Sequence, residues 1–371
     1  MRGFTGRGLA VAAMLAAALV LQFGAIGTRG AEAQTTGLTV ATGAGEPGYA
    51  VNLFGTSKVT VAVGSTLTFK NGWLEPHTVT FSGSKPVPPP SDPTAPVPTN
   101  PGKTVAFDGV TYLNSGFLLK DQTFALSFPN KGTYPFVCII HPGMTGSVDV
   151  VDAGSATIST QAQLDASATK TFADATAALK AASATAAAKG VTKTANADGT
   201  STWTVSVGGL VGPSDLQQFY TPGLNVQAGD TVRWVSAVPT PHTATFLSGT
   251  PLPIPPTPEN QKVLLPTPAP AAGFDGTGYV NSGIIGVGWP GTQFSVKFTK
   301  AGTYPYICVL HVDQGMGGTV TVSQAGQVIP AKTGTGGLVE ATPASTAMQA
   351  ALVLALVGIV AVARRATKAR A

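Results

Sequence analysis

The feature that constrains this chain most is an internal repeat. Short motifs of the first half return in the same order in the second, as in Phe-Asp-Gly at 107 and 274 and Gly-Thr-Tyr-Pro at 132 and 302. The offset grows only from 165 residues, between His77 and His242, to 172, between Met144 and Met316. The matching motifs outline a unit of about 110 residues, which is close to the common size of one domain. The 371 residues therefore contain two copies of one domain, with a linker and two ends.

Within each copy the pattern predicts an all-β fold. Apolar and polar residues alternate over Lys58–Val63 and Thr66–Lys70 around a Gly-Ser turn, and again over Leu224–Gln227 and Thr231–Val235. Apolar residues make up 43% and charged residues only 11%, which excludes a charged disordered chain. Short strands separated by regular turns favour a β-sandwich in each copy.

We place the two domains at 34–152 and 201–325, joined by an Ala- and Thr-rich linker at 153–200. Thr160–Lys189 has apolar residues at helical spacing, a cap at Ser159 or Thr160 and a stop at Gly190, which predicts a helix. A flexible tether is the alternative, because Thr and Ser lower helix propensity.

Both ends carry targeting patterns. Residues 1–33 have two early arginines, an apolar run and a small-residue cleavage site, which predicts a secretory signal with Gln34 as the first mature residue; an uncleaved anchor is the alternative. After a stalk at 326–343, residues 344–363 are uncharged and long enough for a transmembrane helix, and a basic tail follows at 364–371. We expect a body held outside the cell membrane, although a removable sorting signal has the same pattern.

The positive charge lies at these ends. The formal net charge is +5, but seven of the 22 basic residues are terminal, and the body holds 15 basic against 16 acidic residues. Without a basic surface in the body, we expect no nucleic-acid partner.

The four histidines and two cysteines of the chain all fall at repeat-equivalent positions, each set followed by a methionine. The predicted metal ligands are His77, Cys138, His141 and Met144 in the first copy, and His242, Cys308, His311 and Met316 in the second. Two imidazoles, a thiolate and a thioether form the ligand set of a blue-copper site, although the same donors accept zinc. A disulfide between the two cysteines is an alternative that leaves the matching histidines unexplained.

With its two Pro-His pairs and its two Cys-x-x-His loops that end in Met, the chain resembles the cupredoxin family, in particular plastocyanin and amicyanin. The resemblance implies Greek-key sandwiches, each with one copper ion that alternates between Cu(I) and Cu(II). It also implies that the loop histidines, His141 and His311, reach the surface as ports for electrons. The sequence departs from plastocyanin in having Thr78 and Thr243 where an Asn is usual.

These observations predict a membrane-anchored extracytoplasmic electron-transfer protein with two copper sites. By analogy its partners are redox proteins such as a cytochrome c or a terminal oxidase. We expect no enzyme activity, because the two-domain copper enzymes of this fold need further histidines for a second kind of copper centre. A copper-trafficking protein is the alternative, and a structural surface module with vestigial sites is a weaker one.

Overall fold

The computed structural model describes residues 37–88, 103–251, 264–324 and 326. The predicted signal peptide, transmembrane anchor and basic tail lie outside this range. In the part of the chain that is described, no helix is both long and apolar enough to cross a bilayer.

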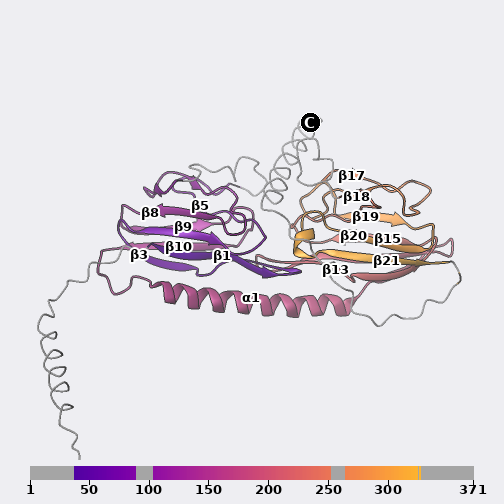
Figure 1. Ribbon diagram of the computed structural model, residues 1–371, viewed down its shortest axis with the longest axis horizontal. Coiled ribbons are helices and arrows are strands. Elements are labelled where there is room, and N and C mark those ends of the chain that lie inside the picture. Colours follow the sequence, from indigo (N-terminus) through magenta and orange to yellow (C-terminus); the bar gives the residue numbers. More distant parts are fainter. Residues whose placement is uncertain (1–36, 89–102, 252–263, 325, 327–371) are drawn as a thin grey trace, which may run out of the picture. The chain divides into compact units, whose positions relative to one another are not determined.

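The first copy is a sandwich of two sheets (Figure 1). The strand order is β2-β1-β4-β8-β6 in one sheet and β3-β10-β9-β5-β7 in the other. The strands are β1 (Leu38–Glu46), β2 (Tyr49–Phe54), β3 (Lys58–Ala62), β4 (Thr66–Asn71), β5 (Thr80–Phe81), β6 (Val105–Ala106), β7 (Leu113–Asn114), β8 (Thr123–Ser127), β9 (Gly132–Val137) and β10 (Thr145–Val151).

The second copy repeats this arrangement. One sheet has the order β13-β12-β15-β19, with β11 paired to β12, and the other has the order β14-β21-β20-β16-β18-β17. The elements are β11 (Thr192–Ala195), β12 (Ser201–Val211), β13 (Ser214–Tyr220), β14 (Gly223–Gln227), β15 (Thr231–Ser236), β16 (Thr245–Phe246), β17 (Pro266–Thr267), β18 (Val280–Ser282), β19 (Gln293–Lys297), β20 (Gly302–Ile307), the 3-10 helix η2 (Val312–Gln314) and β21 (Gly317–Ser323). The strands predicted from alternation are confirmed as β3, β4, β14 and β15.

Each sandwich encloses an aromatic core. In β4, Phe69 is fully buried and packs edge-on against Phe54 and Phe136. The equivalent position in the second copy is Trp234 in β15, which is also fully buried and packs against Tyr306. Each such side chain contributes about 1.5–3 kcal/mol on burial. These cores hold the strands that carry the predicted ligands.

A single sheet runs through both copies. Strand β2 pairs antiparallel with β13, so that Ala50 lies opposite Asp215 and Tyr49 opposite Leu216. This pairing joins one sheet of each sandwich into a ten-stranded sheet. The edge strands of the two copies therefore cover each other, which removes two open edges.

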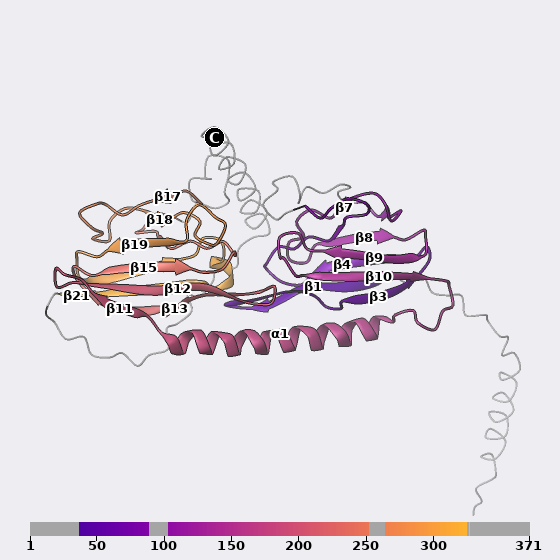
Figure 2. The same ribbon diagram turned by 180° about the vertical axis from the view of Figure 1, so that it is seen from behind.

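The linker forms one long helix, α1 (Gln161–Lys189), which lies along β1 and β13 in both ribbon views (Figures 1 and 2). Thr160 begins it with a capping box formed with Gln163, and Gly190 ends it, as predicted.

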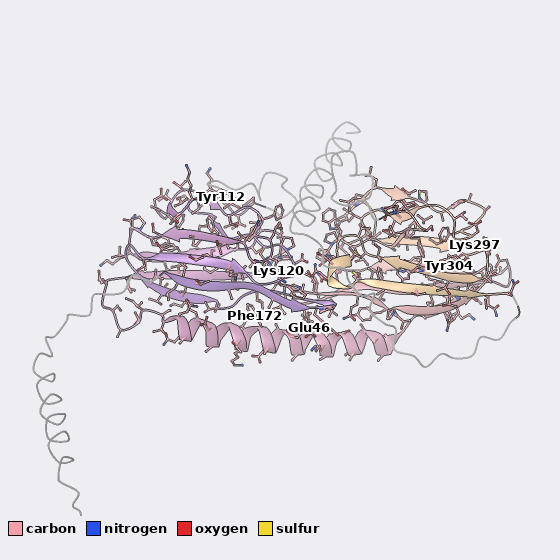
Figure 3. All side chains as sticks on the ribbon, viewed as in Figure 1. Glu46, Tyr112, Lys120, Phe172, Lys297 and Tyr304 are labelled. Carbon is pink, nitrogen blue, oxygen red and sulfur yellow. The ribbon has the colours of Figure 1, made fainter. Side chains whose placement is uncertain are left out.

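The helix contacts both copies. Ser167 Oγ donates to the Gly55 carbonyl of the first copy at 3.0 Å, and Ser183 Oγ donates to Gln218 Oε1 of the second at 2.9 Å. Lys180 forms an ion pair with Glu46, which is labelled beside the helix in Figure 3. The alternative of a flexible tether is wrong, because these contacts and the buried Leu179 fix the helix to the junction.

Candidate metal centres

The first candidate centre is a buried triangle of donor atoms. His77 Nδ1 lies 3.2 Å from His141 Nδ1, and Cys138 Sγ lies 3.5 Å from the same nitrogen. His77 follows β4 and is held by two backbone hydrogen bonds with Leu118, of 3.1 and 2.7 Å. Cys138 and His141 belong to the loop after β9, so two separate segments must fold together before the three donors meet.

The second centre reproduces the first. The ring centroids of His242 and His311 are 5.1 Å apart, against 5.0 Å for His77 and His141. Cys308 Sγ lies 3.4 Å from His311 Nδ1. In both centres the donor atoms of the two histidines and the cysteine all lie within 4.8 Å of one another. The repeat in the sequence is therefore a repeat in site geometry.

Both methionines are buried beside these triangles. The Cys138 amide donates to the Met144 carbonyl at 2.9 Å, and the Cys308 amide donates to the Met316 carbonyl at 3.0 Å. These bonds close each loop, so that its cysteine and methionine are backbone neighbours. Met144 and Met316 remain predicted axial ligands.

Thr78 and Thr243, which stand where plastocyanin usually has Asn, bind the cysteine sulfur through their backbone amides. The Thr78 amide donates to Cys138 Sγ, and the Thr243 amide donates to Cys308 Sγ, both at 3.3 Å. The Thr78 hydroxyl also accepts a hydrogen bond from the amide of Ile139 at 2.9 Å. Each threonine thus links the segment that carries the first histidine to the cysteine loop. Such a contact orients a metal ligand and tunes its electronic properties.

Two glycines make room for the upstream histidines. Gly43 and Gly208 occupy bulges in β1 and β12, with φ angles of 69° and 70°. A Cβ at Gly43 would collide with His77 Nε2, and one at Gly208 would collide with His242 Nε2. Neither glycine was predicted from the sequence, although the two are repeat-equivalent at an offset of 165 residues and that equivalence could have revealed them.

Gly43→Ala is expected to abolish metal binding at the first centre, because the new methyl group displaces the His77 ring. The matched control is Gly64→Ala, where φ is also positive, at 82°, but nothing lies within 4 Å of the added Cβ. Both variants carry a backbone strain of about 1–2 kcal/mol. Copper per chain, measured by elemental analysis, should fall only in Gly43→Ala; equal loss in both variants would mean that strain, and not collision with His77, is the cause.

Each centre holds a cysteine thiolate beside a positively charged loop histidine. Burial raises the pKa of Cys138 and Cys308, but the charges and hydrogen bonds of the two histidines beside each thiol together outweigh burial and hold both thiols well below their usual pKa. Burial lowers the pKa of His77, which keeps that imidazole neutral. Burial also acts to lower the pKa of His311, but the Cys308 thiolate raises it to about 9. A metal cation would replace this positive charge next to the thiolate.

These donor sets fit copper. Both cysteines are free and buried, each beside its own pair of histidines, so the alternative of a disulfide between them is wrong. Both ring nitrogens of His242 are buried without a hydrogen-bond partner among the described residues, so that one of them is available to bind a metal ion. When bound between two imidazoles and a thiolate, copper supplies one-electron redox chemistry.

The predicted surface position of the loop histidines is wrong. His141 and His311 are 9% and 4% exposed, because the loops of the two copies face the junction. His141 Nε2 lies 3.4 Å from Oε1 of Glu75, and His311 Nε2 lies 4.0 Å from Oε2 of the same carboxylate. The edges that the resemblance placed in solvent meet instead at one buried side chain.

Glu75 is charged in this position. Burial raises the pKa of its carboxyl, but the hydrogen bond with His141 and the charge of His311 outweigh burial and hold the pKa well below its usual range. Nothing in the sequence marked Glu75, because its repeat-equivalent residue is Thr240 and so it has no matching partner in the second copy.

The fold and the donor geometry define the class of β-sandwich proteins with buried copper sites. A model of copper-binding proteins of the plastocyanin/azurin family matches residues 48–151 and 208–323. Since these two matches cover more than half of the chain, the protein belongs to that family, with one family domain in each copy.

Individual relatives are similar to one copy at a time. A plastocyanin from Scenedesmus fuscus is 33% identical over 104 residues, which are 28% of this chain and 85% of that protein. Among solved structures, a reduced amicyanin mutant is 25% identical over 31% of this chain and 82% of its own, with a TM-score of 0.22. An oxidised amicyanin mutant is 23% identical over the same shares, with a TM-score of 0.21.

Proposed function

We propose that this chain is an electron carrier with one copper ion in each copy, anchored in the cell membrane with its body on the outer side. The observation that carries the proposal is the pair of matching, fully formed triangles of two histidines and one cysteine. A carrier needs a site that changes little between oxidation states, and donors fixed by buried strands and closed loops meet that need.

The same observation weighs against a trafficking role. Copper delivery requires donors that exchange metal readily, whereas all six His and Cys donors are buried. It also weighs against an enzyme, since the four histidines of the chain are divided between the two triangles and none is left for a further copper centre.

The membrane location and the partners rest on the sequence alone. The pattern of residues 1–33 supports export, and the apolar stretch 344–363 followed by basic residues supports a retained anchor. The redox partners we propose are a cytochrome c or a terminal oxidase, by analogy with the family.

The test uses the full chain, extracted from membranes with detergent. We expect two copper ions per chain, a mature protein that begins at Gln34, and an intense visible absorption of thiolate bound to Cu(II) that is bleached by a mild reductant and restored by an oxidant. Colourless protein that retains Cu(I) would indicate trafficking, and protein that takes up no copper would indicate a structural module.

A further inference from the structure

We propose that Glu75 links the two metal centres into one electron-exchanging pair, so that electrons pass between them inside a single chain. This inference rests on the proposed function and deepens it: the loop histidines carry electrons between the two centres.

The link consists of three side chains from both copies. Glu75, in the loop after β4, directs one carboxylate oxygen to His141 of its own copy, at 3.4 Å, and the other to His311 of the second copy, at 4.0 Å. Each of these histidines is also in contact with its cysteine through Nδ1, at 3.5 and 3.4 Å. A continuous series of close contacts therefore runs from Cys138 to Cys308.

The second copy fixes the carboxylate in place. Gln217 Nε2 in β13 and Gln314 Nε2 in η2 both donate to Glu75 Oε2, at 2.9 and 3.0 Å. Within the first copy, Asn71 Nδ2 donates to the backbone carbonyl of Glu75 at 2.8 Å. A carboxylate held from both sides keeps both imidazoles in one orientation.

The two metal-binding loops differ in length, and the longer one contributes to the link through Glu75. Four residues separate His311 from Met316, but only two separate His141 from Met144. The longer loop contains Gln314, which is 3% exposed and whose carbonyl accepts from the Gly48 amide of the first copy at 2.9 Å. The additional length thus supplies a residue that binds both Glu75 and the facing hairpin.

A second buried carboxylate fastens the junction without contacting the loop histidines. Asp215 accepts from Asn52 Nδ2 of the first copy at 2.8 Å and from Thr240 Oγ1 of its own copy at 2.6 Å. Asn52 is the repeat equivalent of Gln217, and Thr240 is the repeat equivalent of Glu75. The junction is thus approximately symmetric, and Glu75 is the carboxylate that lies between the imidazoles.

The exchange itself balances without another reactant. One centre is oxidised from Cu(I) to Cu(II) while the other is reduced from Cu(II) to Cu(I). No covalent bond forms or breaks and no proton leaves the Glu75 cluster. What the protein provides is a short path and a fixed geometry that needs little rearrangement.

In the principal test, a rapid pulse supplies less than one electron per oxidised chain. The visible spectra of the two centres then show how quickly that electron redistributes between them. Cys138→Ser and Cys308→Ser, each with one centre, supply the reference spectra. In the wild type we expect a redistribution rate that does not depend on protein concentration. Glu75→Gln should slow it by about tenfold, which is ~1.4 kcal/mol in the barrier, because a neutral amide cannot accept from both imidazoles and the geometry of the link is lost.

Glu46→Gln is the matched control, because Glu46 is a partly exposed acid of the same copy that pairs with Lys180 and does not contact either centre. It should leave the rate unchanged. Glu75→Asp keeps the charge but shortens the reach by one methylene group, so it should also slow the exchange, and it decides the question if Glu75→Gln does not fold. A rate proportional to protein concentration, or one unchanged in both Glu75 variants, would overturn the link.

A second readout needs no electron transfer. In the fully reduced protein, NMR signals of the Nε2 protons of His141 and His311 should exchange slowly with solvent, and both should shift in Glu75→Gln. If only the His141 signal shifts, Glu75 serves one centre and the link is refuted. If the wild type takes up no copper or shows no reversible colour, the proposed function itself fails, which is a distinct result.

Discussion

Replacing Cys138 by Ser is expected to reduce the copper content from two ions per chain to one and to remove the visible absorption of the first centre alone. The thiolate is the only soft anionic donor in that triangle, and a serine hydroxyl neither ionises near neutral pH nor matches copper's preference for sulfur. Cys308→Ser should give the mirror result. Elemental analysis and difference spectra measure both.

The pair of variants serves as its own control. The two difference spectra should add up to the wild-type spectrum, since each variant retains one intact triangle. Unchanged copper content in either variant would contradict the assignment of that cysteine as a ligand. Complete loss of copper in one variant would show that the second centre cannot fill unless the first is occupied.

Phe69→Ala is expected to destabilise the protein by about 3–5 kcal/mol, the usual cost of emptying a large aromatic site in a core. Phe69 is fully buried and contacts the rings of Phe54, Phe81 and Phe136. The free energy of unfolding, measured by denaturant titration of the metal-free protein, gives the effect directly.

Val110→Ala is the control for this variant, because Val110 is 59% exposed and should change the stability by no more than about 0.5 kcal/mol. Trp234→Ala tests the equivalent core site of the second copy and should match Phe69→Ala within the same range. A loss below about 1 kcal/mol in Phe69→Ala would contradict the packing of this core.

Much of the fold and of the site could be predicted from sequence because the signals are local and occur twice. Alternation over Lys58–Val63 fixed a strand face, and the capping residues Thr160 and Gly190 fixed the ends of a helix within one residue. The histidines and cysteines could be paired with their equivalents in the other copy without knowing any contact.

The remaining features had no local signal. The strands β1, β2, β12 and β13 were not predicted individually, although they carry the pairing of the two copies. Gly43 acts through a collision that depends on where His77 lies in space. Glu75 is a single acidic residue without a repeat counterpart, and its role depends on contacts with Gln217 and Gln314, which lie 142 and 239 residues away.

The amino-acid sequence by itself determined that there are two equivalent domains, several of their strands, the helix that joins them, and which three His and Cys side chains gather in each buried site. Only the tertiary structure decided that the two sites face each other across Glu75 and that their loop histidines are hidden from solvent. The physical reason is that strand periodicity and ligand spacing are properties of one segment, whereas the docking of two copies depends on edge-strand pairing and side-chain contacts between distant segments.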